Sequence, residues 1–178
     1  MVDEIKNEQC PVCNEKALTL REEEKDIPYF GKVFIFSMKC EKCGFSKADV
    51  ECAETKDPTS YTIEVNSEKD MQIRVVKSSE ATVKIPQMRM SMTPGPISEG
   101  FVTNIEGILD RFKAIIEQER DESEDPEVKK HAKNLLKKIW KIKLGDIPLK
   151  IVIEDPTGNS AIISDKAKVE KLKVAKTK

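Results

Sequence analysis

Two short cysteine motifs, Cys10-Pro-Val-Cys13 and Cys40-Glu-Lys-Cys43, decide the fold of the first third of this chain. Each Cys-x-x-Cys turn places two thiols on one side of a tight loop, so two such turns can surround a single ion. Four sulfur ligands in a tetrahedron favour Zn²⁺. Because protein atoms fill all four positions, none is left for a water nucleophile. The pattern therefore predicts one structural zinc per chain.

The same cysteines have two other interpretations, an iron–sulfur cluster and a redox-active dithiol. A redox motif is expected as one pair beside a βαβ pattern, whereas here two pairs enclose a strand-rich segment. The fifth cysteine, Cys52, is expected as a half-buried strand residue, with a fifth metal ligand or a reactive thiol as its alternatives. The only histidine, His131, lies in a helical stretch and is expected to pack at the surface or at a helix end.

Composition limits the class of protein. The chain has 178 residues, of which 38% are hydrophobic and 35% are charged, as expected for one globular domain or two small ones. The longest apolar run, residues 33–36, is far too short to span a bilayer, and the N-terminus does not resemble a secretory signal. We therefore expect a cytoplasmic protein. No phosphate-binding loop, Gly-x-Ser-x-Gly or His-Glu-x-x-His motif is present, and we predict that the protein is not an enzyme.

Residues 1–52 are predicted to form a zinc ribbon. Strands are expected at residues 17–21, 29–39 and 47–52, of which the second is rich in aromatic and β-branched residues. The polar run 22–26 is expected to be an exposed loop. A three-stranded sheet of this size needs its metal to stay folded.

Residues 53–164 are predicted to form a mainly β domain with a helical insertion. Apolar and polar residues alternate over 61–92, and strand signals return at 149–153 and 160–164. Between them, at about 103–145, apolar residues follow a helical period on two stretches joined by a short connection. This pattern predicts an antiparallel helical hairpin inserted into the β domain.

Local signals mark the ends of these helices. Thr103 followed by Glu106 fits a capping box for the first helix, and Asp125 before Pro126 fits the start of the second. The last stretch, residues 165–178, has six lysines against two acidic residues and is predicted to be a basic flexible tail.

The charge of the ribbon bears on its partners. Residues 1–52 carry 8 basic and 11 acidic side chains. A nucleic-acid-binding finger needs a positive face to contact phosphates, so the acidic ribbon argues against nucleic acid and favours a protein with a basic surface. The alternative is a zinc ribbon that binds nucleic acid or the ribosome or transcription machinery. It is supported by the type of finger and by the lysines of residues 165–178.

Six stretches, in this order along the chain, resemble the ZPR1 zinc-finger protein family. They are Cys10-Pro-Val-Cys13, Ile27-Pro28-Tyr29-Phe30, Cys40-Glu-Lys-Cys43-Gly44-Phe45, Ser79-Glu-Ala-Thr82-Val-Lys-Ile85-Pro86, Thr103-Asn-Ile-Glu106-Gly107-Ile108 and Asp155-Pro156-Thr157-Gly158-Asn159-Ser160. The resemblance implies a double-stranded β-helix with an inserted helical hairpin, behind a finger similar to that of translation initiation factor 2 beta. Eukaryotic members carry two such modules, so a single module is similar to the archaeal form.

The resemblance also implies a function. The family is associated with binding the GTPase translation elongation factor 1-alpha and assisting its folding, and this activity is the leading hypothesis. The partner contacts would come from the turn that holds Ile27, Tyr29 and Phe30, although packing within the ribbon is an equal alternative for the two aromatic residues. The stretch 155–160 has the composition of a tight turn, with Pro156 and Gly158 at the turn positions, and a recognition role is its alternative.

Overall fold

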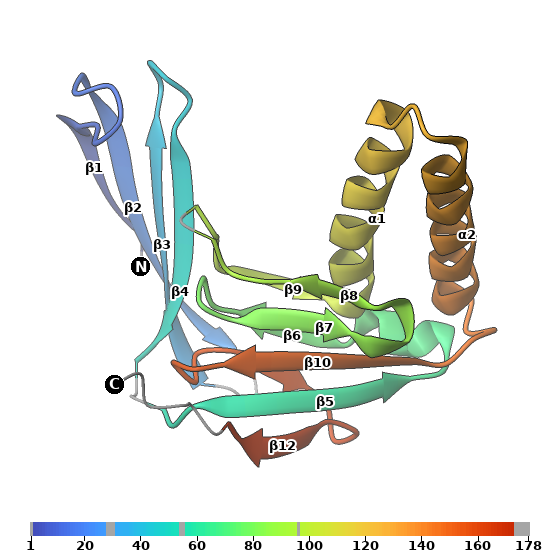
Figure 1. Cartoon of the computed structure of the whole chain (residues 1–178). Coiled ribbons are helices and arrows are strands. Elements are labelled where there is room, and N and C mark those ends of the chain that lie inside the picture. Colours follow the sequence, from blue (N-terminus) through green and yellow to red (C-terminus); the bar gives the residue numbers. More distant parts are fainter. Residues whose placement is uncertain (1, 28–30, 54–55, 96, 173–178) are drawn as a thin grey trace, which may run out of the picture.

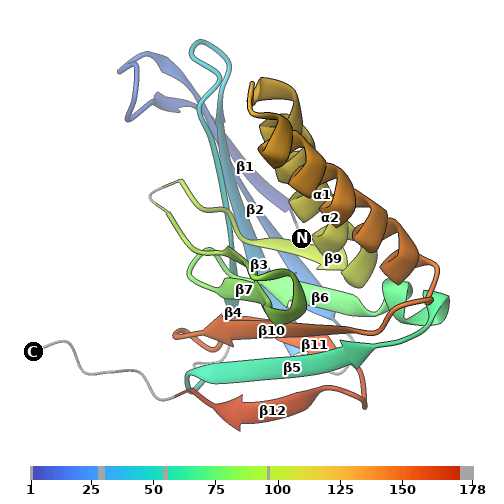
Figure 2. The same ribbon diagram turned by 45° about the vertical axis from the view of Figure 1, so that its right-hand side comes forward.

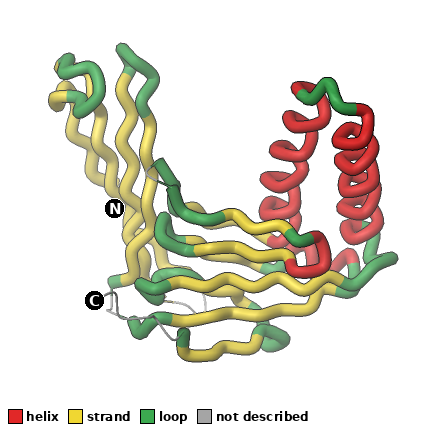
Figure 3. The backbone as a smooth tube through the Cα atoms, in the orientation of Figure 1, coloured by secondary structure: helices red, strands yellow, loops and turns green. Residues whose placement is uncertain are grey.

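The chain forms a β ribbon that stands against one end of a β sandwich, with a helical hairpin at the other end (Figure 1). The computed structural model describes residues 2–27, 31–53, 56–95 and 97–172. The ribbon and the hairpin extend from the sandwich on the same side, and both views of the ribbon diagram agree on this arrangement (Figures 1 and 2). Strand is the dominant secondary structure, and the two long helices lie together (Figure 3).

The ribbon is a four-stranded antiparallel sheet with the order β1-β2-β3-β4. Its strands are β1 (Val2–Gln9), β2 (Lys16–Ile27), β3 (Gly31–Cys40) and β4 (Ser46–Cys52). The prediction of three strands missed β1, and the loop expected at residues 22–26 is wrong, because β2 continues to Ile27. The polar end of β2 pairs with β3 up to the Ile27–Gly31 pair. Backbone hydrogen bonds to the long strand β3 therefore keep this segment in a strand although its side chains are polar.

The sandwich is built from two sheets whose strands come from distant parts of the sequence. A five-stranded sheet has the order β12-β5-β10-β7-β8, and a three-stranded sheet has the order β11-β6-β9. The strands are β5 (Thr59–Val65), β6 (Arg74–Lys77), β7 (Thr82–Ile85), β8 (Met90–Met92), β9 (Phe101–Asn104), β10 (Leu149–Asp155), β11 (Ala161–Ile163) and β12 (Lys168–Lys171). Two 3₁₀ turns, η1 (Glu68–Gln72) and η2 (Pro86–Met88), connect them.

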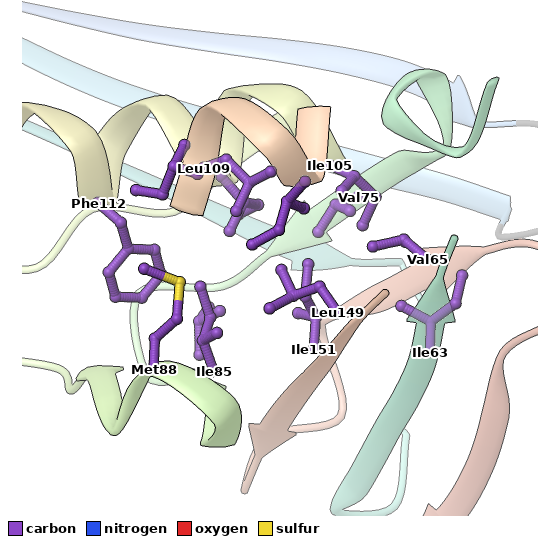
Figure 4. Close-up of a cluster of buried hydrophobic side chains, with 14 of the residues drawn as sticks. Ile63, Val65, Val75, Ile85, Met88, Ile105, Leu109, Phe112, Leu149 and Ile151 are labelled. Atoms are coloured by element: carbon purple, nitrogen blue, oxygen red, sulfur yellow. The ribbon is translucent and has the colours of Figure 1, made fainter. Parts of the chain in front are cut away.

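One hydrophobic core joins the sandwich to the hairpin. In Figure 4, Phe112 of the first helix lies beside Met88 of η2, and Ile151 of β10 lies near the same centre. The strand β6 shows how period two divides its side chains between two cores. Val75 points into this sandwich core, whereas Val76 packs with Val33 and Val50 of the ribbon. The small sheet β11-β6-β9 therefore supports the ribbon with its outer face.

The helical hairpin consists of α1 (Ile105–Glu122) and α2 (Pro126–Lys143), which confirms the predicted insertion. The first cap differs from the prediction by one residue. Asn104, the last residue of β9, is the N-cap, and its Oδ1 accepts a hydrogen bond of 2.8 Å from the Gly107 N–H. Asp125 caps α2 as predicted, since its Oδ1 accepts from the Glu127 N–H at 2.8 Å.

The predicted basic tail is partly ordered. Lys168–Lys171 forms β12, which pairs antiparallel with β5, and the Leu172 N–H donates to the Pro58 carbonyl at 3.0 Å. A flexible tail from residue 165 onward is therefore wrong for this stretch. The edge of β5 presents backbone N–H and C=O groups, so β12 can form hydrogen bonds with it although its side chains are mostly charged. Residues 173–178 lie outside the described part of the chain.

Candidate metal centre

Two turns of matching geometry carry the four paired cysteines. In the turn between β1 and β2 the Asn14 N–H donates to the Cys10 carbonyl at 2.9 Å, and between β3 and β4 the Gly44 N–H donates to the Cys40 carbonyl at 3.1 Å. Asn14 and Gly44 both have positive φ, of 59° and 75°. Glycine adopts this conformation without strain, and asparagine tolerates it better than most residues. The sequence therefore builds the same loop twice, at the free end of the ribbon (Figure 1).

The four sulfur atoms form a compact cluster. Cys10 Sγ lies 3.7 Å from Cys43 Sγ, Cys13 Sγ lies 3.7 Å from Cys40 Sγ, and all four atoms lie within 4.8 Å of one another. A tetrahedron with Zn–S bonds of about 2.3 Å has S–S edges of about 3.8 Å. The cysteines are free thiols, and their spacing fits one Zn²⁺ bound by all four. The predicted ligand set is thus brought together by strands that are distant in sequence.

The electrostatics of the thiols also favour a bound cation. Burial acts to raise the pKa of Cys10, but the N–H groups of Cys13 and Val12 and the neighbouring thiols outweigh it and lower the pKa to about 7. The Glu15 N–H acts to lower the pKa of Cys13, but burial and the other thiols raise it to about 12. One thiolate therefore forms readily, and further ionisation needs a positive charge at the centre of the cluster.

Apolar side chains close the inner side of the cluster. Cys10 and Cys40 are fully buried, Cys13 is partly buried and Cys43 is exposed. Leu18 is buried with them, and a few partly buried side chains pack around this group, namely Ala17, Leu20, Met38 and Phe45. With four protein ligands and no vacant position, an ion held here would stabilise the ribbon rather than activate a substrate.

The other residues singled out from the sequence lie elsewhere. Ile27 is only 3% exposed and packs with Val33 and Val76 at the junction between the ribbon and the sandwich. This burial argues against a partner contact through its side chain. Tyr29 and Phe30 lie outside the described residues. Cys52 is half-buried at the end of β4, as expected, and burial raises the pKa of its thiol.

A polar junction that sequence reasoning did not predict fixes the ribbon to the sandwich. Both carboxylate oxygens of Asp49 in β4 accept hydrogen bonds from Ser79, at 3.0 Å from its N–H and 2.6 Å from its hydroxyl. The Gly100 N–H donates to the Ala48 carbonyl at 2.9 Å. A Cβ at Gly100 would lie 2.7 Å from the Val50 nitrogen, so only glycine allows this approach.

The turn at residues 155–160 belongs to the same junction. Asp155 is fully buried, and its Oδ1 accepts from the N–H and hydroxyl of Thr157, as the turn interpretation predicts. Its Oδ2 accepts from the hydroxyls of Ser78 and Ser160. The Asn159 side-chain oxygen accepts from the Cys52 N–H at 3.1 Å and so reaches the ribbon. The sequence marked this stretch as a turn, but the contacts of Asp155 with Ser78 and of Asn159 with Cys52 join distant parts of the chain and cannot be predicted from the turn motif.

Comparison with known proteins agrees with this geometry. The ZPR1 zinc-finger domain matches residues 3–58, and the ZPR1 jelly-roll domain matches residues 69–178. The chain belongs to the ZPR1 family. The predicted double-stranded β-helix with an inserted hairpin is confirmed as the jelly-roll domain of this family, and the four clustered cysteines form the metal site of its zinc finger.

Relatives within the ZPR1 family fall into two groups. A ZPR1-like protein of Pyrococcus horikoshii is 41% identical over 96% of this chain and 78% of its own length, and one of Methanocaldococcus jannaschii is 38% identical over 97% and 91%. The zinc finger chaperone zpr1 of Schizosaccharomyces pombe is 35% identical over 76% of this chain but only 30% of its own length. The chain therefore covers most of the length of the two archaeal relatives and less than a third of the fission yeast protein.

Proposed function

We propose that this ZPR1 family member binds translation elongation factor 1-alpha and assists its folding, without catalysing a reaction of its own. The observation that carries the proposal is the closed four-cysteine centre at the free end of an acidic ribbon. A site with four protein ligands offers no position for a reactant, so the ion serves to hold a surface in shape. The name of the fission yeast relative, a zinc finger chaperone, supports a protein partner for this surface.

The charge of the ribbon supports the same class of partner. Residues 1–52 carry three more acidic than basic side chains, and four thiolates around one Zn²⁺ add further negative charge. Such a surface attracts a basic protein and repels phosphate backbones. No helix in the described ranges is long and apolar enough to cross a membrane. A cytoplasmic location stays a prediction.

Two measurements test the proposal. In the first, purified zinc-loaded chain is titrated with purified elongation factor 1-alpha in a calorimeter. In the second, elongation factor that has been unfolded in denaturant is diluted with and without the chain, and recovery of GTP binding is followed. We expect saturable binding and a higher yield of active GTPase. No binding and no gain in yield would contradict the proposal.

A pull-down from a source-cell lysate, with and without nuclease, separates this function from the nucleic-acid alternative. Capture of elongation factor 1-alpha that survives nuclease treatment supports the chaperone. Ribosomal material that disappears with nuclease supports the alternative, in which the lysines of residues 165–178 contact phosphates.

A further inference from the structure

The ribbon carries an apolar groove on the face that points away from the sandwich. The groove has a volume of about 430 Å³ and lies across β1 to β4. Ile5, Leu20 and Met38 form one row of its floor, since Ile5 pairs with Leu20 and Leu20 pairs with Met38 in the sheet. Phe36 lies two residues from Met38 on the same face. The opposite face of the sheet packs against the sandwich through Val33 and Val50.

The groove floor is unusually apolar for a surface sheet. Ile5 is 56% exposed, and Leu20, Phe36 and Met38 are each only partly buried. Leu20 and Met38 also pack against the cysteine cluster, so the metal centre supports one end of the groove. The volume lies within the range of about 300–1,000 Å³ that is typical of ligand sites. A folded ribbon therefore presents a ready-made cleft beside its zinc site.

Carboxylates lie beside Phe36 in this apolar floor, although the carboxylate of Asp49 is bound by Ser79 of the sandwich. In the neighbouring row, Asp3 pairs with Glu22, Glu22 pairs with Phe36, and Phe36 pairs with Asp49, so these side chains share the face of the groove. Glu51 also lines the groove, as do two basic residues, Arg21 and Lys47, and Lys47 pairs with Met38 at the other end of the floor. Like charges placed directly opposite one another, as Asp3 and Glu22 are, destabilise a sheet. Among the ion pairs of the described residues, none includes Asp3, Glu22 or Glu51.

We infer that this groove holds an extended segment of the protein client whose groove-facing side chains, at every second position, include both apolar and basic residues. The apolar side chains cover Leu20, Phe36 and Met38, and the basic ones lie between Asp3, Glu22 and Glu51. A cation beside Phe36 also contacts an aromatic face. The partner thereby places positive charge beside Asp3 and Glu22 and offsets the repulsion between these two paired carboxylates. The inference rests on the proposed function, because it names the surface by which the ribbon holds its client.

A peptide experiment tests the groove without the elongation factor. Two blocked eight-residue peptides are titrated into the zinc-loaded full chain, one with the repeat Val-Ser-Lys-Ser and one with the repeat Val-Ser-Glu-Ser, so that valine and the charged residue share one face of the extended peptide. Binding is followed through the NMR methyl signals of Ile5, Leu20 and Met38. We expect saturable shifts with the lysine peptide and none with the glutamate peptide. Equal shifts with both peptides, or shifts confined to other methyls, would overturn the inference. Shifts that depend on protein concentration without any peptide would also overturn it, since the occupant would be a second copy of the chain.

Substitutions connect the groove to the client. Glu22→Lys and Phe36→Ala are expected to weaken binding of elongation factor 1-alpha about tenfold each, and the loss for Glu22→Lys should shrink as salt rises. The matched controls, Glu170→Lys and Val169→Ala on β12, should leave the affinity unchanged. Methyl spectra of the variants show that the ribbon is still folded.

The two hypotheses fail in different ways. If wild type binds the elongation factor and both groove variants bind it equally well, the groove inference is wrong and the proposed function stands. If the lysine peptide occupies the groove and the elongation factor does not bind at all, the proposed function is wrong and the groove stands.

Discussion

The buried carboxylate of Asp70 gives the sandwich a predictable dependence on pH. Asp70 is 4% exposed in η1, and its Oδ1 lies 2.6 Å from the Lys166 ammonium, while its Oδ2 accepts from the Asn66 N–H at 3.0 Å. Burial acts to raise the pKa of this carboxyl, but Lys166 and the backbone donor outweigh it and lower the pKa from 3.8 to about 2. The pair connects the end of β5 to the segment before β12.

The shift converts into free energy of unfolding. A difference of roughly two pKa units corresponds to about 2 kcal/mol. Because the folded pKa lies below the unfolded one, the unfolded chain binds more protons between pH 4 and pH 2. This stabilisation is therefore fully present above pH 4 and is lost as pH falls through 2. Replacing Asp70 by asparagine should lower the free energy of unfolding by about 2 kcal/mol at pH 7 and by little at pH 2.

The assay is urea unfolding of wild type and Asp70→Asn at pH 7, 5, 3.5 and 2.5, followed by circular dichroism of the α1–α2 hairpin. Comparing the two proteins at each pH cancels any common effect of acid on the cysteine cluster. Asp165→Asn, an exposed neighbour of Lys166, is the matched control and should behave as wild type. A constant difference between wild type and Asp70→Asn across this range would refute the reasoning, as would an NMR titration of Asp70 with a midpoint near 4.

Three further substitutions, two of them with a matched control, test the metal centre and the junction. Cys13→Ser should abolish tight zinc binding and unfold the ribbon, because metal binding contributes on the order of 10 kcal/mol to folding at such sites. The control Cys52→Ser should keep the metal. Equal zinc content in the two variants would contradict this. Val76→Ala should lower the free energy of unfolding by about 2 kcal/mol in urea, since the valine is fully buried between ribbon and sandwich. Gly100→Ala should lower the free energy of unfolding by about 1–3 kcal/mol, because the added Cβ crowds β4. Gly95→Ala is the control and should change this free energy little, since the space around its Cβ position is open. Similar losses of stability for both variants would contradict the close approach of Gly100 to β4.

The sequence was informative where local chemistry determines the structure. The cysteine spacing predicted the metal cluster because both turns are built from their own residues, with Asn14 and Gly44 supplying the positive φ. The helical hairpin was equally predictable, since its apolar period and the Asp125–Pro126 start are local signals. Cys52 is also half-buried at the end of β4, as predicted.

Features that depend on distant partners were not predictable. The continuation of β2 past residue 22 and the strand β12 both arise from backbone pairing with β3 and β5, which polar side chains do not reveal. The burial of Ile27 depends on Val76, almost fifty residues away, and the groove depends on register across β1 to β4. In the same way, Asp155 meets Ser78 only after the sandwich has folded.

The most direct test of the account is X-ray absorption at the zinc edge of the full chain, combined with its metal content. We predict one zinc per chain, four sulfur neighbours at about 2.3 Å and no nitrogen or oxygen in the inner shell. Iron in place of zinc, or an inner shell that includes water or another light atom, would contradict the claim that Cys10, Cys13, Cys40 and Cys43 close the site.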